Sequence, residues 1–271
     1  PEPPEKTETL DGKEMDLEFT AVRFSYEADR EILKGVSMEF PAGSFTSIVG
    51  TSGCGKSTAA AILMGRNQGY QGSVTIEGKE LSLIREDSLM EHITLVSHNS
   101  YLFKGTVEDN LRMGKPDASE EEMENALKSV NLWGFLSAQQ GLATPLAEKG
   151  ANLSGGQCQR LAIARALLHD TPAYIFDEAT SNIDAESEEM IMDVIHALAK
   201  TKTVILISHR LANVVGSDRI YMMKDGRIEE ADSHEELLEA GGEYAKLYRS
   251  QMELEQYGKR KAEEYGKEAA V

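Results

Sequence analysis

The chain has 271 residues and carries 28 Lys and Arg against 46 Asp and Glu, a formal net charge of −18 at pH 7. This length can bury a substantial apolar core, and an acidic surface of this size repels nucleic-acid backbones, so no nucleic acid is expected as a partner. Two cysteines at unrelated spacing give neither a metal site nor a disulfide framework.

The first part of the chain predicts a linker followed by strands. Residues 1–14 are polar and proline-rich, and we expect them to be a linker from a preceding segment. Apolar residues then alternate at Val22, Phe24 and Tyr26, which predicts a strand with one buried face. Stretches 72–81 and 219–230 each contain a glycine turn between apolar residues, so antiparallel hairpins are expected to form a small sheet.

Other apolar runs predict a second, different sheet. Stretches 45–49, 173–176 and 203–207 are short, continuous and unalternated, which is typical of strands buried on both faces of a parallel sheet. Helical apolar stripes lie between them, with a capping box at Ser119 and a similar start at Ser233. The fold class is therefore α/β. After about residue 250 the chain is charged on all sides, and 251–271 are expected to be a solvated helix or a frayed tail.

The stretch GTSGCGKST at residues 50–58 matches the pattern G-x-x-x-x-G-K-[ST] between a buried strand and an alanine-rich helix. Glycines let the backbone curl so that N–H groups and the helix N-terminus face phosphates, while Lys56 reaches the β and γ oxygens and Ser57 can bind Mg²⁺. The residues expected to hold the nucleotide here are Gly50, Thr51, Ser52, Gly53, Cys54, Gly55, Lys56, Ser57 and Thr58.

Acidic and imidazole side chains follow two of the predicted buried strands. Asp177 and Glu178 end one strand and His209 follows another. In open parallel sheets, ligands bind outside the carboxyl ends of the strands, so all three are expected to face the phosphates. Asp177 would hold Mg²⁺, Glu178 would polarise the attacking water, and His209 would reach the γ-phosphate.

A second glycine-rich entry to a helix, LSGGQ, follows at residues 153–157. Together with the motifs above, it resembles the nucleotide-binding domain of ATP-binding cassette (ABC) transporters from about Leu17 to Gln251. The resemblance implies a P-loop NTPase core with a mostly parallel sheet, a small antiparallel β subdomain and an α-helical subdomain that carries LSGGQ. The domain would occupy residues 15–250.

The resemblance also implies cofactors and partners. ATP and Mg²⁺ would bind, Tyr26 would stack on the adenine, Asp184 would end the D-loop, and His209 would be the switch histidine. In the family, two domains pair head to tail, so the partner would be a second nucleotide-binding domain in a homodimer or heterodimer. The segment of each domain that closes over the neighbour's ATP consists of Ser154, Gly155, Gly156 and Gln157.

Two further segments resemble the exporter branch. Residues 100–114 resemble the segment that contacts the membrane domain, and 145–157 resemble the loop before the signature, with an acid at Glu148. The resemblance therefore implies a transmembrane permease domain, N-terminal in the full-length chain, and a location at the cytoplasmic face of the cell membrane. The expected function is ATP hydrolysis that drives export.

One residue departs from the family pattern, because His98 stands where the family has a glutamine that reaches Mg²⁺ and the water. Imidazole is a softer ligand for this hard ion, so altered metal dependence, or a pH dependence near neutrality, is expected unless a water bridges the gap. Two alternatives stay open. One is a regulatory half of a heterodimer with weak or no hydrolysis, and the other is a DNA-repair type clamp, which usually separates its motifs by long coiled coils.

Overall fold

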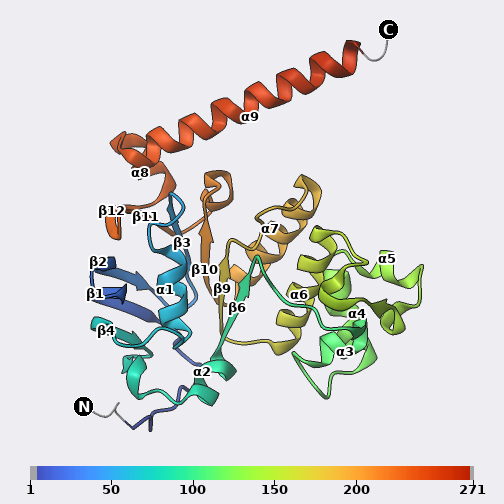
Figure 1. The fold of residues 1–271 in the computed structure, drawn as a ribbon, viewed down its shortest axis with the longest axis horizontal. Coiled ribbons are helices and arrows are strands. Elements are labelled where there is room, and N and C mark those ends of the chain that lie inside the picture. Colours follow the sequence, from blue (N-terminus) through green and yellow to red (C-terminus); the bar gives the residue numbers. More distant parts are fainter. Residues whose placement is uncertain (1–4, 269–271) are drawn as a thin grey trace.

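The computed structural model describes residues 5–268, with side-chain surroundings up to residue 258. Residues 1–4 of the expected linker and 269–271 of the expected tail lie outside the described residues. Two sheets lie on one side of the molecule and a group of helices on the other, with one long helix at an edge (Figure 1).

The central sheet has six strands in the order β12-β11-β3-β10-β9-β6, and only β12 runs antiparallel to its neighbour. Every residue of three of its strands is buried, because helices or the second sheet cover both faces. This confirms the predicted mostly parallel α/β core. The strands are β3 (Phe45–Gly50), β6 (Ile93–Ser97), β9 (Ala173–Asp177), β10 (Thr203–Ser208), β11 (Arg219–Lys224) and β12 (Arg227–Asp232).

A second sheet is antiparallel, in the order β2-β1-β4-β5. Its strands are β1 (Leu17–Glu27), β2 (Arg30–Phe40), β4 (Gln71–Ile76) and β5 (Lys79–Glu80). The expectation that hairpin 219–230 belongs to a small sheet is wrong, since β11 pairs in parallel with β3. The physical reason is that Ile220 to Met223 are all buried, and such a strand needs cover on both faces.

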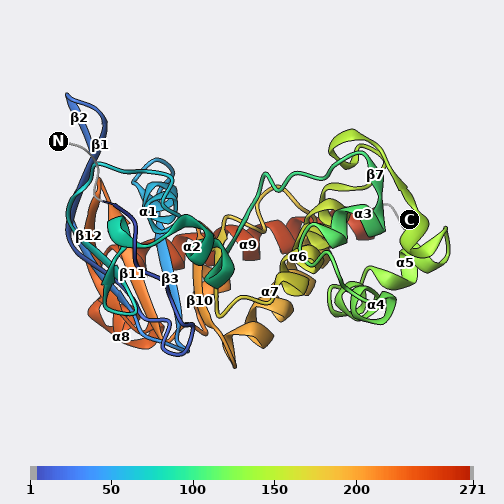
Figure 2. The ribbon, with the colours of Figure 1, turned by 90° about the horizontal axis from the view of Figure 1, so that it is seen from below.

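Helices fall into groups on either side of the central sheet. Helix α1 lies between the two sheets, and α6 and α7 cover the other face of the central sheet (Figures 1 and 2). Helices α3 to α5 lie at the end of the molecule opposite the antiparallel sheet. The helices are α1 (Lys56–Leu63), α2 (Glu86–His92), α3 (Val107–Arg112), α4 (Glu120–Ser129), α5 (Trp133–Ser137), α6 (Gly155–His169), α7 (Ala185–Ala199), α8 (His234–Ala240) and α9 (Glu243–Glu268). A short ribbon pairs β7 (Gly105–Thr106) with β8 (Pro145–Leu146).

Two hydrophobic clusters fill the two sides of the central sheet. One lies between the sheets and includes Phe19, Ile62 and Ile205, so α1 is held by both sheets. The other includes Leu127, Ile163 and Phe176 and joins α4 and α6 to the sheet. The helical region that carries LSGGQ and the strands that carry the acids therefore share one core.

The described parts of the expected linker and tail contact the domain. The Glu8 N–H donates to the Leu83 carbonyl at 2.9 Å, and Leu10 is only 6% exposed. The expected tail boundary at residue 251 falls inside α9, which begins at Glu243. Within residues 5–268, no helix combines the length and apolar character needed to cross a membrane.

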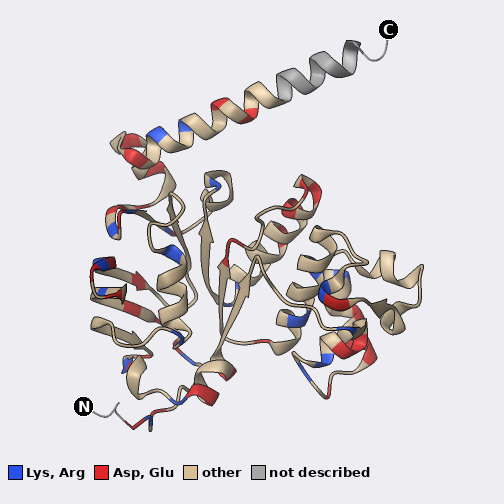
Figure 3. Cartoon of the chain, viewed as in Figure 1, with Lys and Arg blue, Asp and Glu red and all other residues tan. Residues whose placement is uncertain are grey.

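The acidic excess gathers away from the centre of the sheet. Figure 3 shows acidic residues on α2, α4 and α8, and each of these helices carries Asp or Glu in its first turn. Carboxylates in that position favour the helix because they oppose its positive end. The carboxylates in these first turns thus stabilise local structure.

Candidate functional site

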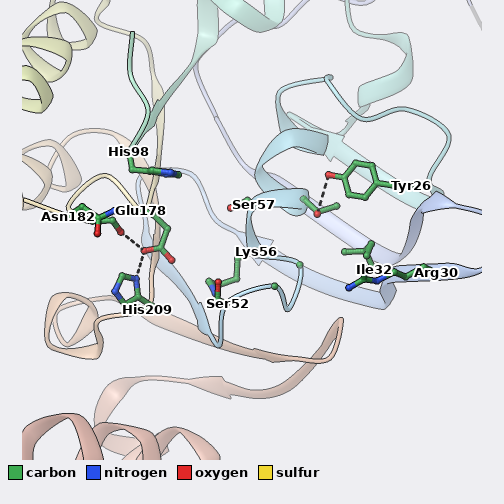
Figure 4. Close-up of a pocket in the computed structure, with 14 residues that line it drawn as sticks. Tyr26, Arg30, Ile32, Ser52, Lys56, Ser57, His98, Glu178, Asn182 and His209 are labelled. Atoms are coloured by element: carbon green, nitrogen blue, oxygen red, sulfur yellow. Dashed lines mark hydrogen bonds and ion pairs between the residues drawn. The ribbon is translucent and has the colours of Figure 1, made fainter. Parts of the chain in front are cut away.

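A cavity of about 560 Å³ lies where β3, β9 and β10 end (Figure 4). Parallel neighbours end at the same edge of a sheet, which brings together residues that are far apart in the sequence. Residues predicted from the sequence that line it are Tyr26, Ser52, Gly53, Gly55, Lys56, Ser57, Thr58, His98, Glu178 and His209.

The loop from Gly50 to Gly55 owes its shape to positions where a side chain does not fit. Gly50, Gly53 and Gly55 have φ angles of 152°, 81° and 111°, which L-residues with a side chain rarely adopt. A Cβ at Gly50 would lie 3.1 Å from the carbonyl carbon of Met223. The loop therefore curls tightly against β11 and presents its backbone to the cavity.

Lys56 lies along this loop and not in solvent. Its side chain is buried, and Nζ donates to the carbonyls of Gly50 at 2.7 Å and Thr51 at 3.0 Å. The ammonium is thus held beside the start of α1, where free backbone N–H groups could bind an anion. Cys54 is also buried, in the cluster between the sheets, so this residue can offer a nucleotide only its backbone.

Asp177 and Ser57 form an oxygen pair at the edge of the cavity. The Ser57 hydroxyl donates to Asp177 Oδ1 at 3.1 Å. Burial raises the pKa of Asp177 above its ordinary value, the Ser57 hydrogen bond opposes that shift, and the charge of Glu178 adds to it. A cation at this position would relieve the cost of the buried carboxylate.

Glu178 and His209 contact each other directly. Glu178 has a φ of 54°, a rare left-handed conformation that turns the chain sharply after β9. Its Oε2 lies 2.6 Å from His209 Nδ1 and accepts a hydrogen bond from the Ser181 hydroxyl at 3.0 Å. The Glu178 carboxylate, after β9, and the His209 imidazole, after β10, thus form a hydrogen-bonded pair that faces the cavity (Figure 4).

Tyr26 lies at the far side of the cavity. The residue is 61% exposed, whereas Val22 and Phe24 are buried, so the expectation that Tyr26 shares their buried face is wrong. The strand is irregular here, with register shifts after Phe24 and Ser25, and the alternation does not continue. The Tyr26 hydroxyl lies 3.3 Å from Thr58 Oγ1, which orients the ring beside the start of α1 (Figure 4).

The LSGGQ segment lies at the start of α6, outside the cavity. Ser154 is the N-cap of α6 and forms a capping box with Gln157, and the two residues between them begin the helix. Among the described residues that line the cavity, none belongs to 154–157. Gly155 is exposed, and its N–H lies in the first turn, where no partner exists within the helix.

Gly156 is the contact point between α6 and α7. A Cβ at this position would lie 2.6 Å from Ser187 Cβ and 2.8 Å from Asp184 Oδ2. Asp184 caps α7 by accepting from the Ser187 N–H at 2.8 Å. The beginnings of the two helices are therefore packed together without space for a methyl group.

His98 is exposed at the turn after β6 and lines the cavity. Its N–H donates to the Asp177 carbonyl at 3.2 Å, which ties this turn to the end of β9. Gln159 on α6 donates from Nε2 to the Ser97 carbonyl at 3.0 Å. The turn that carries His98 thus contacts both the strand with the acids and the LSGGQ helix.

Four cavity residues were not predicted from the sequence. Ser181 and Asn182 belong to the stretch SNID, which the resemblance gave as the D-loop but did not assign to the cavity. Arg30 and Ile32 lie at the start of β2, and only the pairing of this strand with β1 brings them beside Tyr26.

Comparison with known proteins identifies the family. The family model described as ABC transporter matches residues 33–181. An uncharacterized ABC transporter ATP-binding protein of Haemophilus influenzae is 44% identical over 242 residues, 89% of this chain and 43% of the relative. An ATP-dependent lipid A-core flippase of Saccharophagus degradans is 39% identical over 251 residues, 92% of this chain and 43% of the relative. A bacterial Atm1-family ABC exporter with ATP bound superimposes with a TM-score of 0.85 at 38% identity, over 90% of this chain and 43% of that chain.

The chain belongs to the ABC transporter family and is its ATP-binding domain, an ATPase. Its fold is the ABC P-loop fold. It spans less than half the length of these relatives, two of which are named as a flippase and an exporter.

The close contact at Gly156 predicts a difference between two neighbouring glycines. Gly156→Ala should lower the free energy of unfolding by about 1–3 kcal/mol, because Ser187 is buried and cannot withdraw. Gly155→Ala should change it by less than about 0.5 kcal/mol, since its Cβ would lie 3.9 Å from the nearest atom. Urea denaturation of both variants measures this, and equal stabilities would contradict the packing at Gly156.

Proposed function

We propose that this chain binds Mg-ATP in the cavity, pairs with a second nucleotide-binding domain, and uses hydrolysis to drive export through a membrane domain. The observation that supports pairing is that the cavity and the LSGGQ segment lie apart within one chain. Lys56, Glu178 and His209 line one cavity, while the helix start at Ser154 and Gly155 lies outside it and is exposed. A second copy can bring its own helix start to the open side of the cavity.

The cavity suits a nucleoside triphosphate from end to end. The exposed Tyr26 ring offers a face for the adenine, although such a face accepts any base. The loop at residues 50–58 gives backbone donors and one buried ammonium to the phosphates. Glu178 and His209 lie at the other end, where the γ-phosphate would extend.

The oxygen pair at Ser57 and Asp177 fits a magnesium ion. Mg²⁺ prefers oxygen ligands and commonly binds through one or two carboxylates together with substrate phosphates. Within the described residues no cluster of three or more His, Cys, Asp or Glu could hold a metal by itself, which agrees with a site completed by the nucleotide. A bound Mg²⁺ would neutralise charge on the β and γ phosphates.

Hydrolysis needs a water molecule aligned with the γ-phosphorus. The Glu178 carboxylate would accept a hydrogen bond from that water and draw its proton as the new P–O bond forms and the bond to the ADP oxygen breaks. His209, already 2.6 Å from Glu178, would orient the carboxylate and donate to a γ oxygen. ADP and inorganic phosphate leave, and the bridge to the neighbour's helix start is lost.

The partner in the membrane would contact the segment at residues 100–114. Tyr101 and Phe103 are 42% and 47% exposed, and their rings pack edge to face with centroids 4.7 Å apart. An exposed aromatic pair of this kind is typical of protein interfaces. We place the domain at the cytoplasmic face of a membrane, in agreement with the flippase and exporter among its relatives.

The alternatives receive less support. A DNA-repair type clamp needs long coiled coils between its motifs, whereas Lys56 and Ser154 are about 100 residues apart and separated by short helices. A regulatory half with weak hydrolysis would be expected to lack the catalytic base. Here Glu178 is present and lies in hydrogen-bond contact with His209, which argues against that alternative.

Replacement of the proposed base should trap the paired state. Glu178→Gln should slow hydrolysis by at least about 100-fold, because the amide cannot accept the proton of the water. With Mg-ATP the variant should form a dimer in light scattering, and a second change, Ser154→Arg, should abolish it. A variant that binds ATP and stays monomeric would contradict self-pairing and favour a heterodimer.

His98 generates a prediction about metal preference. An imidazole favours softer ions than an amide oxygen does, so His98→Gln should lower the ratio of Mn²⁺-supported to Mg²⁺-supported ATPase activity about two- to tenfold. His196→Gln, on α7 against Phe45, serves as the control. An unchanged ratio would mean that a water bridges this position and that the substitution is silent.

A further inference from the structure

Helix α9 is anchored to the domain by its first turns. Tyr244 and Ala245 are fully buried, and the Tyr244 N–H donates to Glu230 Oε2 at 2.8 Å. Residues one, two and three turns further along the same face of a helix point in nearly the same direction. Gln251 and Glu255 therefore face the domain, where they meet the segment after β10.

Gln251 bridges the backbone on both sides of Arg210. Its Nε2 donates to the His209 carbonyl at 2.7 Å, and its Oε1 accepts from the Leu211 N–H at 2.9 Å. Both ends of one amide are used, and both partners are main-chain groups of the segment that carries the switch histidine.

Arg210 extends the same contact to α7. Its guanidinium donates to Glu255 on α9, with Nη2 3.1 Å from Oε1, and to Glu188 on α7. Glu188 is buried and also accepts from Asn213 Nδ2 at 2.8 Å. The segment 209–211 is thus held between two helices, and α7 is the helix that follows the D-loop.

The histidine ring itself is less restrained than its backbone. The His209 side chain is 62% exposed and touches Glu178 through Nδ1 at 2.6 Å. The direction in which the ring points therefore depends on how the backbone of residues 209–211 is fixed. A shift of about 1 Å in a catalytic group is enough to cost much of the rate.

We propose that Gln251 is a positioning residue that fixes the His209 backbone so that the imidazole reaches Glu178 and the γ-phosphate. The role rests on the proposed function, and it assigns a part in hydrolysis to a residue at the start of the segment that was expected to be a solvated helix or a frayed tail. Gln251 does not line the cavity, so it acts through His209 and not on the nucleotide.

Kinetics of the 271-residue chain test this assignment. Gln251→Ala should lower the kcat for ATP about fivefold to tenfold with an unchanged KM, because the misplaced ring affects the chemical step and not binding. Glu253→Ala is the matched control, since this residue lies on the exposed face of the same helix. A KM that rises with an unchanged kcat would overturn the proposal.

A double-mutant cycle separates positioning from general destabilisation. In a His209→Ala background the same Gln251→Ala change should cost less than about twofold, because the ring it positions is absent. An equal fold loss in both backgrounds would overturn the proposal, since it would mean that Gln251 acts independently of His209.

A measurement without hydrolysis keeps this inference separate from the proposed function. In the nucleotide-free chain, the His209 imidazole resonances, assigned by their loss in His209→Ala, should shift in Gln251→Ala and stay in place in Glu253→Ala. Unchanged resonances in Gln251→Ala would overturn the positioning role. Absence of ATPase activity in the unaltered chain would instead overturn the proposed function and leave the resonance shift to decide this inference.

Discussion

The close approach of two backbone segments at the end of β3 is the constraint on which the site depends. Gly50 lies so near the carbonyl of Met223 on β11 that no side chain fits between them. This contact exists because β11 adds to the parallel sheet beside β3. The curl of the loop, the burial of Lys56 and the direction of α1 all follow from it, because each is fixed relative to that edge of the sheet.

The same sheet edge explains why the acids and the histidine meet. β9 and β10 end together, so Glu178 and His209 come into contact although 31 residues separate them. Two helices then support this contact from outside the cavity. α7 follows the D-loop and contacts Gly156 of the LSGGQ segment, and α9 contacts the backbone beside His209. Both helices thus contact the segment that begins with His209, α7 through Glu188 and Arg210 and α9 through Gln251.

Much of the core and the phosphate loop could be predicted from the sequence, because continuous apolar runs and a glycine pattern are local signals. The place of β11 was missed although Ile220 to Met223 form a continuous apolar run like those of the other parallel strands, because the glycine turn that follows them also indicates a hairpin. The exposure of Tyr26 depends on irregular pairing near the strand end. Gln251 gave no signal, because a glutamine in a charged helix has no pattern that points to a loop 40 residues earlier.

The central claim is that each ATP is held between two copies of the chain. The most direct test mixes two variants that are expected to be inactive alone: Lys56→Ala, which lacks the ammonium proposed to bind the phosphates, and Ser154→Arg, which would block the LSGGQ surface. A shared site predicts that the equimolar mixture hydrolyses ATP well above either variant alone, because one intact composite site forms in each mixed pair. A mixture no more active than the mean of the two variants would contradict a site built from two chains.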